Sequence, residues 1–137
     1  MDGNRPGNLD IVSTRRPIRS ETWEGATWWT RALILRDGDS APAQISDVNS
    51  WSVRVYDGGT QVYALANQSP SDAFSNTLRT AGWDGVEAGY NFARPLTPSD
   101  FAWVGGVTYQ AEFTIATVSD GTLQVVHITE IQGLYSV

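Results

Sequence analysis

The sequence of 137 residues has no cysteine, and a single histidine accompanies its 15 acidic residues. Without cysteine the chain can form neither disulfides nor thiolate metal sites, and this composition favours assembly in a reducing cytosol. Apolar stretches are only a few residues long, so we expect neither a membrane span nor a signal peptide. At this length we expect one domain that buries a core without cross-links.

Lysine is also missing, so all nine basic residues are arginine. This usage suits bidentate pairing at interfaces, although a GC-rich genome would produce the same bias. Net charge is −6, which argues against nucleic acid as a partner because phosphate neutralisation requires clustered positive charge. Residues 1–22 hold four arginines against three acids, or +1, and the rest of the chain holds five against twelve, or −7. The N-terminal segment therefore differs in character from the body.

Residues 1–20 have few bulky apolar side chains, and no helical or strand period persists there. We therefore expect an extended N-terminal arm at 1–20, followed by the folded domain at 21–137. Such an arm is either a frayed terminus or a segment that binds a neighbouring subunit. On either interpretation it should contribute little to the folding of the isolated domain. On the second, its arginines are the candidate partner-binding residues, namely Arg5, Arg15, Arg16 and Arg19.

The clearest pattern lies at 107–135, where two β-rich segments flank a Ser-Asp-Gly-Thr turn at 119–122. In the first segment Tyr109, Phe113 and Ile115 fall on one side and polar residues on the other, which is the period of a half-buried strand. The second segment is more apolar, which predicts a strand covered over part of both faces. Asp-Gly between two such segments is typical of a β-hairpin.

Similar patterns predict further strands along the chain. Residues 26–36 are apolar on both sides, as expected of one strand covered on both faces. Residues 51–56 and 61–66 predict a hairpin with Trp51, Val53 and Val55 facing inward. Residues 67–92 are rich in glycine and turn formers, which predicts a long loop insertion, with a short helix at 71–78 and a strand at 87–93. Together these elements predict an all-β fold, an antiparallel β-sandwich of about seven strands that is immunoglobulin-like or, alternatively, a jelly roll.

The sequence contains no recognisable catalytic or metal-binding pattern. His127 lies inside a predicted strand without a Gly-x-Ser-x-Gly motif, so we interpret it as a structural histidine that is hydrogen-bonded to a neighbour or faces water. A calcium loop starting at Asp37 would require a carboxylate at position 48, which is Val48. The glycines at 82, 85 and 89 lack phosphate-loop spacing. We therefore expect no enzyme activity, no cofactor and no metal.

Six tryptophans are unusual for a chain of this size. Trp51 and one of Trp28 or Trp29 are in phase with aliphatic neighbours, which predicts core positions. Trp83 lies in the predicted loop with no strand to bury it, so we expect it to anchor a protein–protein contact. An exposed, coplanar set drawn from Trp23, Trp28, Trp83 and Trp103 would instead indicate a carbohydrate-binding module.

Three parts of the chain combine into a recognisable pattern of strands and turns. They are ETW at 21–23 with LILRDG at 33–38, APAQISDV at 41–48 with WSVRVYD at 51–57, and LTPSD at 96–100 with GGVTY at 105–109. Over residues 21–66 and 96–135 this pattern resembles the small immunoglobulin-like modules of tailed-phage virion proteins. Examples are the amino-terminal module of baseplate upper proteins and some capsid cement proteins. The arm at 1–20 and the insertion at 67–92 depart from the compact module.

The resemblance implies a non-enzymatic bacteriophage virion protein that is assembled in the host cytoplasm. The leading expectation is a capsid cement or decoration protein that binds the major capsid protein or other virion structural proteins, and that is itself a homo-oligomer. A baseplate or tail adaptor subunit is the alternative within this class, and a carbohydrate-binding β-sandwich module is the alternative outside it. Neither nucleic acid nor membrane is an expected partner.

Overall fold

The chain folds, in a computed structural model, into an all-β domain. The structure describes residues 9–11, 18–36, 41–83, 88–118 and 121–132. These residues form ten strands and two short 3-10 helices: β1 (Leu9–Ile11), β2 (Ile18–Trp23), β3 (Trp28–Ala32), β4 (Ile34–Arg36), η1 (Ile45–Asp47), β5 (Val48–Asp57), β6 (Thr60–Gln68), η2 (Pro70–Asp72), β7 (Phe74–Arg79), β8 (Tyr90–Leu96), β9 (Thr108–Thr117) and β10 (Thr122–Gln132).

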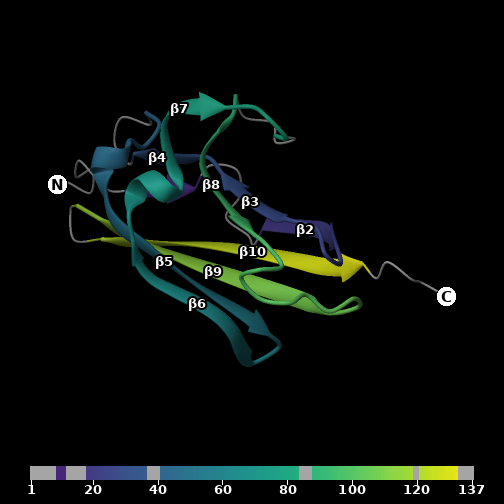
Figure 1. Cartoon of the computed structure of the whole chain (residues 1–137). Helices are drawn as coiled ribbons and strands as arrows, with labels where there is room; N and C mark the ends of the chain where they lie inside the picture. The colour runs from purple at the N-terminus through teal and green to yellow at the C-terminus, as the bar shows by residue number, and fades with distance from the viewer. Residues whose placement is uncertain (1–8, 12–17, 37–40, 84–87, 119–120, 133–137) are drawn as a thin grey trace.

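Two sheets pack face to face as a sandwich. The larger sheet has the order β2-β10-β9-β5-β6, and the smaller has the order β3-β8-β7. Strands β1 and β4 form a separate antiparallel pair. Figure 1 shows the smaller sheet lying over the larger one. Between the sheets, the rings of Phe92 and Phe113 meet edge to face with their centroids 5.1 Å apart, so the core joins β8 to β9 directly.

The predicted C-terminal hairpin is confirmed. Strands β9 and β10 pair antiparallel from Ala116 opposite Thr122 to Thr108 opposite Glu130. The inward residues of β9 are all buried, as the alternation predicts. Residues 119–120 of the predicted turn lie outside the described residues. The inward residues of β10 include a histidine, since the buried positions are Val125, His127, Thr129 and Ile131.

The second hairpin is also confirmed. Strands β5 and β6 pair antiparallel, and Trp51, Val53 and Val55 are buried in the core. Gly58 in the connecting turn has φ of +61°, a conformation that glycine adopts without strain. The indole N–H of Trp51 donates a hydrogen bond to the carbonyl of Ser69 over 2.8 Å, so the buried ring keeps a polar partner.

The predicted single strand at 26–36 is two strands in two sheets. In β3 the inward positions are Trp28, Thr30 and Ala32, but Leu33 and Ile34 are then both buried. The buried parity continues from Ala32 to Ile34, and Leu33 separates β3, which pairs with β8, from β4, which pairs with β1. Because the alternation is not interrupted at the break, the two strands had the appearance of one strand in the sequence.

A buried asparagine holds β4 to the rest of the sandwich. The backbone N–H of Ile34 donates to Asn91 Oδ1 over 2.9 Å, and Asn91 Nδ2 donates to the carbonyls of Ile34 at 2.8 Å and Ala43 at 3.1 Å. Asn91 is in β8, on the smaller sheet. Its side chain therefore supplies the hydrogen bonds that a neighbouring strand would otherwise provide.

The prediction of a long loop at 67–92 is wrong for most of its length. Strand β6 continues to Gln68, η2 and β7 follow, and β8 begins at Tyr90. The expected helix at 71–78 is instead η2 followed by the strand β7. Only Phe74 of β7 is fully buried, and four of its six residues are exposed. A strand with one buried position leaves too few apolar residues for a period to be visible.

The predicted boundary between an arm and a domain at residue 20 is also wrong. Residues 18–23 form β2, which pairs in parallel with β10 and places Ile18 opposite His127 and Arg19 opposite Ile128. The larger sheet is therefore mixed rather than antiparallel. The hydroxyls of Thr22 and Thr129 hydrogen-bond over 2.8 Å in the interior, which fastens β2 to β10. Arg5, Arg15 and Arg16 lie outside the described residues.

Deleting residues 1–20 is therefore expected to destabilise the isolated domain. The deletion removes half of β2 and uncovers the edge of β10, which we expect to cost about 2 kcal/mol in hydrogen bonding and apolar burial. The melting temperature should fall by roughly 5–10 °C. Deletion of residues 1–8 is the matched control, because it removes no residue of β1 or β2. Equal melting temperatures for the full chain and the 1–20 deletion would contradict this role of β2.

Candidate partner-binding site

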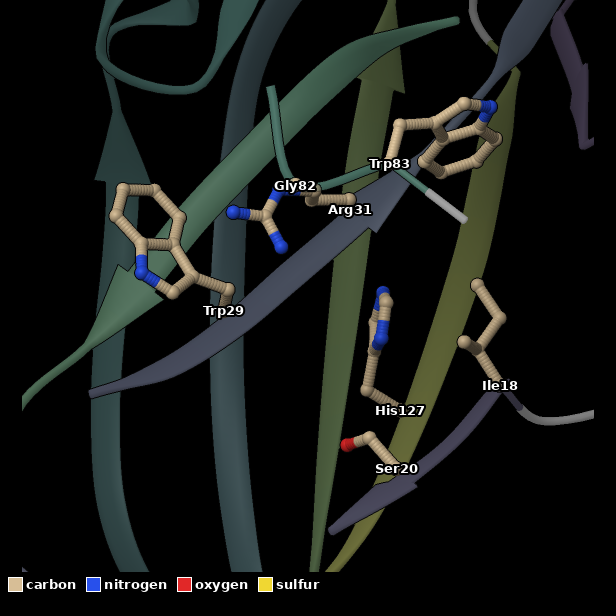
Figure 2. A pocket seen from close by; sticks show the side chains of 7 residues that line it. All are labelled: Ile18, Ser20, Trp29, Arg31, Gly82, Trp83 and His127. Atoms are coloured by element: carbon tan, nitrogen blue, oxygen red, sulfur yellow. The ribbon is translucent and has the colours of Figure 1, made fainter. Parts of the chain in front are cut away.

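A pocket lies where the β2 edge of the larger sheet faces β3 of the smaller one. It encloses about 160 Å³ and is lined by Ile18, Ser20, Trp29, Arg31, Gly82, Trp83 and His127. Figure 2 shows these side chains gathered from β2, β3, β10 and the segment after β7. The alternation of β3 places Trp29 and Arg31 on the side opposite the buried Trp28 and Thr30. Two aromatic rings, a guanidinium and an imidazole thus share one small concavity.

Trp83, the predicted anchor, lines this pocket but is not fully exposed. Its ring lies against Tyr90 with the centroids 5.5 Å apart, and its backbone N–H donates to the carbonyl of Thr80 over 2.9 Å. Gly82 has φ of +70°, which turns the chain just before Trp83. The prediction of a loop tryptophan without any strand to cover it is therefore wrong, because β8 supplies that cover.

The exposed tryptophan of the pocket is Trp29, with 47% of its surface accessible. The sequence predicted that one of Trp28 and Trp29 is buried, and Trp28 is the buried one. Trp103, which packs edge to face on Trp28 with centroids 6.1 Å apart, is buried as well. The set of four tryptophans considered for a sugar platform therefore does not form an exposed row.

Arg31 is held among aromatic rings. Its Cζ lies 4.7 Å from the centroid of the Trp29 ring and 5.4 Å from that of Tyr90, which are cation–π distances. A Cβ on Gly82 would lie 2.7 Å from Nη2 of Arg31, so glycine leaves the space that the guanidinium occupies. Arg31 Nε is buried and has no hydrogen-bond partner among the described residues. The ring contacts thus hold the cation without a hydrogen bond from the described residues to Nε.

His127 forms part of the wall of the pocket on β10. The residue is 2% exposed, and burial lowers the pKa of its imidazole from 6.5 to about 3. The ring is therefore neutral at neutral pH, with one nitrogen that donates and one that accepts. Its buried Nε2 has no hydrogen-bond partner in the described part of the chain. The expectation that His127 bonds a neighbour or faces water is wrong, because the β10 alternation turns it inward.

An imidazole with a pKa near 3 is a weak base, and among the described residues no hydrogen bond joins it to Ser20. No three histidine, aspartate or glutamate side chains in the described ranges come together as a metal site. Over the same ranges, no helix has the length and apolar character needed to cross a bilayer.

The structure brings together only some of the predicted site residues. Trp83 lies in the pocket, and Arg19 lies on β2 between two residues that line it, Ile18 and Ser20. Trp29, Arg31 and His127 were not predicted from the sequence as site residues. Trp29 and Arg31 share one parity of β3 and therefore one face of the strand, but both parities of residues 26–36 contain apolar residues, which hid that face. The contribution of His127 requires the pairing of β2 with β10, which no local pattern reveals.

Comparison with known proteins adds no further assignment. The sequence matches no protein-family model, and no curated protein matches it significantly.

Proposed function

We propose that this chain is a non-enzymatic structural protein of a bacteriophage virion. Its role is that of a capsid cement or decoration protein, which binds neighbouring capsid subunits and stabilises them. The observation that carries this proposal is the pocket with its exposed Trp29, its aromatically held Arg31 and Trp83. Tryptophan and arginine dominate the binding energy of protein interfaces when they are clustered at one place.

The size of the pocket supports a protein partner over a small molecule. Small-molecule sites usually enclose about 300–1,000 Å³. The pocket here encloses about 160 Å³, which is enough for one side chain. A partner that inserts a single side chain would bury the ring of Trp29 at the same time.

The strand order supports the immunoglobulin-like part of the resemblance over the jelly roll. In immunoglobulin-like sandwiches strands B, E and D share one sheet, while G, F and C share the other, with C′ added in variable-type domains. Here β3-β8-β7 follows the order B-E-D, and β10-β9-β5-β6 follows the order G-F-C-C′. The chain order of these strands also agrees with that lettering.

The alternatives predict different copy numbers. A baseplate or tail adaptor subunit would use the same pocket but would be present in far fewer copies than a capsid cement protein. A mass-spectrometric inventory of purified particles would distinguish the two. A carbohydrate-binding module is not favoured, because Trp28 and Trp103 are buried in the core.

Substitution of Trp29 tests the proposed binding surface. We expect Trp29→Ala to weaken binding to particles that lack this protein by about 10- to 30-fold, the effect of losing one interface hot spot. Trp23→Ala is the matched control, since Trp23 is also an exposed strand tryptophan and does not line the pocket. It should change binding by less than about twofold. Equal binding by wild type and Trp29→Ala would refute the assignment of this surface.

A further inference from the structure

Two polar groups of the pocket have buried atoms that lack partners. Arg31 Nε and His127 Nε2 are both buried without hydrogen bonds among the described residues. A buried polar group left unpaired destabilises a protein, and more so when the group is charged. Both residues line the same concavity. The pocket therefore lacks hydrogen-bond partners that a polar ligand would supply.

The charges select the kind of ligand. Arg31 supplies one positive charge, and the neutral imidazole of His127 adds none, so the pocket matches a group with a single negative charge. A cationic side chain would meet the guanidinium, and an apolar one would leave both polar groups unpaired. A carboxylate accepts the paired N–H groups of a guanidinium in a bidentate manner, and its remaining acceptor positions can take a hydrogen bond from an imidazole.

The remaining walls fit the stem of an acidic side chain. Ile18, Trp29 and Trp83 present apolar surface around the polar centre. A volume of about 160 Å³ admits a carboxylate and a few methylene groups, but not a cofactor. A side chain that ends in a carboxylate satisfies both requirements.

Resting on the proposed function, we propose that the pocket binds the carboxylate of an aspartate or glutamate side chain of the partner protein. Arg31 forms the ion pair with the carboxylate, His127 contributes a hydrogen bond, and the rings of Trp29 and Trp83 cover the stem. The aromatic contacts of Arg31 position its guanidinium before the partner arrives, which lowers the conformational entropy that binding would otherwise cost.

Propionate is the probe, because it reproduces the end of a glutamate side chain. The full-length protein is titrated with sodium propionate up to about 100 mM, and the indole N–H signals of the tryptophans are followed by NMR at constant ionic strength. Signals of Trp29 and Trp83 are expected to shift saturably, with a dissociation constant in the millimolar range that is typical of a fragment of this size. Propionamide, which has the same shape without the charge, should bind at least about tenfold more weakly.

Arg31→Gln tests the proposed ion pair. It should weaken propionate binding at least about tenfold, whereas Arg54→Gln should change it by less than about twofold. Arg54 is the matched control because it is exposed on the outer face of β5 and does not line this pocket. The wild-type comparison of propionate with propionamide remains decisive if Arg31→Gln fails to fold.

Absence of a saturable shift with propionate, or equal binding of propionamide, would overturn the carboxylate proposal. The same holds if folded Arg31→Gln binds propionate like the wild type. These measurements use the isolated protein, so they are independent of virion binding. Propionate binding without any effect of Trp29→Ala on particle attachment would reject the use of this surface in virion binding and leave the carboxylate site standing, whereas failure of the wild type to attach to particles would reject the proposed function itself.

Discussion

Replacing Trp51 by alanine is expected to lower the free energy of unfolding by about 3–5 kcal/mol. The side chain is 1% exposed, and its ring belongs to the core, with its centroid 6.1 Å from that of Phe113. Removing it opens a cavity between the sheets and leaves the carbonyl of Ser69 without its indole donor. A domain of this size has a total stability of only about 5–15 kcal/mol, so the substitution should remove a large fraction of it.

Urea denaturation of two variants measures this effect. Trp23→Ala serves as the control, because Trp23 is 57% exposed at the end of β2 and its loss should cost less than about 1 kcal/mol. The difference between the variants then reports burial rather than the general loss of an indole. Equal losses of unfolding free energy for the two variants would show that burial of Trp51 does not stabilise the core of the sandwich.

Acidification is expected to destabilise the protein through His127. The unfolded imidazole has a pKa of about 6.5, whereas burial lowers the folded value to about 3. Between these values the unfolded state binds one more proton than the folded state, so stability falls as the pH falls. From pH 7 to pH 4 this difference amounts to about 3 kcal/mol of lost stability.

The effect of His127 is isolated by comparison with His127→Gln, which cannot titrate. Both proteins contain the same carboxyl groups, whose contributions cancel in the difference between the two pH profiles. We expect the free energy of unfolding of the wild type to fall by about 3 kcal/mol more than that of the variant between pH 7 and pH 4. Parallel profiles would mean that His127 is solvated in the folded protein and that the pocket is open to water at that depth.

The sequence predicted well where one face of a strand is buried and its neighbour is close in the chain. The hairpins β5-β6 and β9-β10 meet both conditions, because their alternation is regular and their turns contain glycine. The inward positions of Trp51, Val53 and Val55 follow from the same alternation. Local spacing was sufficient there because the pairing partner is the next segment.

Pairings between distant segments were missed. Thr22 and Thr129, which fasten β2 to β10, are separated by 107 positions in the chain, and β2 contains arginine, serine and glutamate. A polar edge strand has no apolar period, so residues 18–20 looked like part of an arm. Strand β7 was missed for the same reason, since its only fully buried residue is Phe74.

The candidate site could be predicted only in part. Trp83 was identified from its neighbours in the chain, but the covering ring of Tyr90 comes from a strand that begins after residues 84–87. Arg31 and His127 acquire their importance because the fold brings β3 and β10 to one pocket. Whether such residues come together depends on the sheet topology, and the sequence predicted only the class of fold.

Asn91 has a consequence for which substitutions the sandwich can accept. Its amide group both accepts from and donates to the backbone of Ile34, and it donates to Ala43 as well. Aspartate has the same shape but no donor for the two carbonyls, and leucine has a similar volume but neither function. Position 91 therefore requires a donor and an acceptor on the same side chain, and matching its size or polarity alone is not sufficient. The usual conservative replacements should for this reason be damaging.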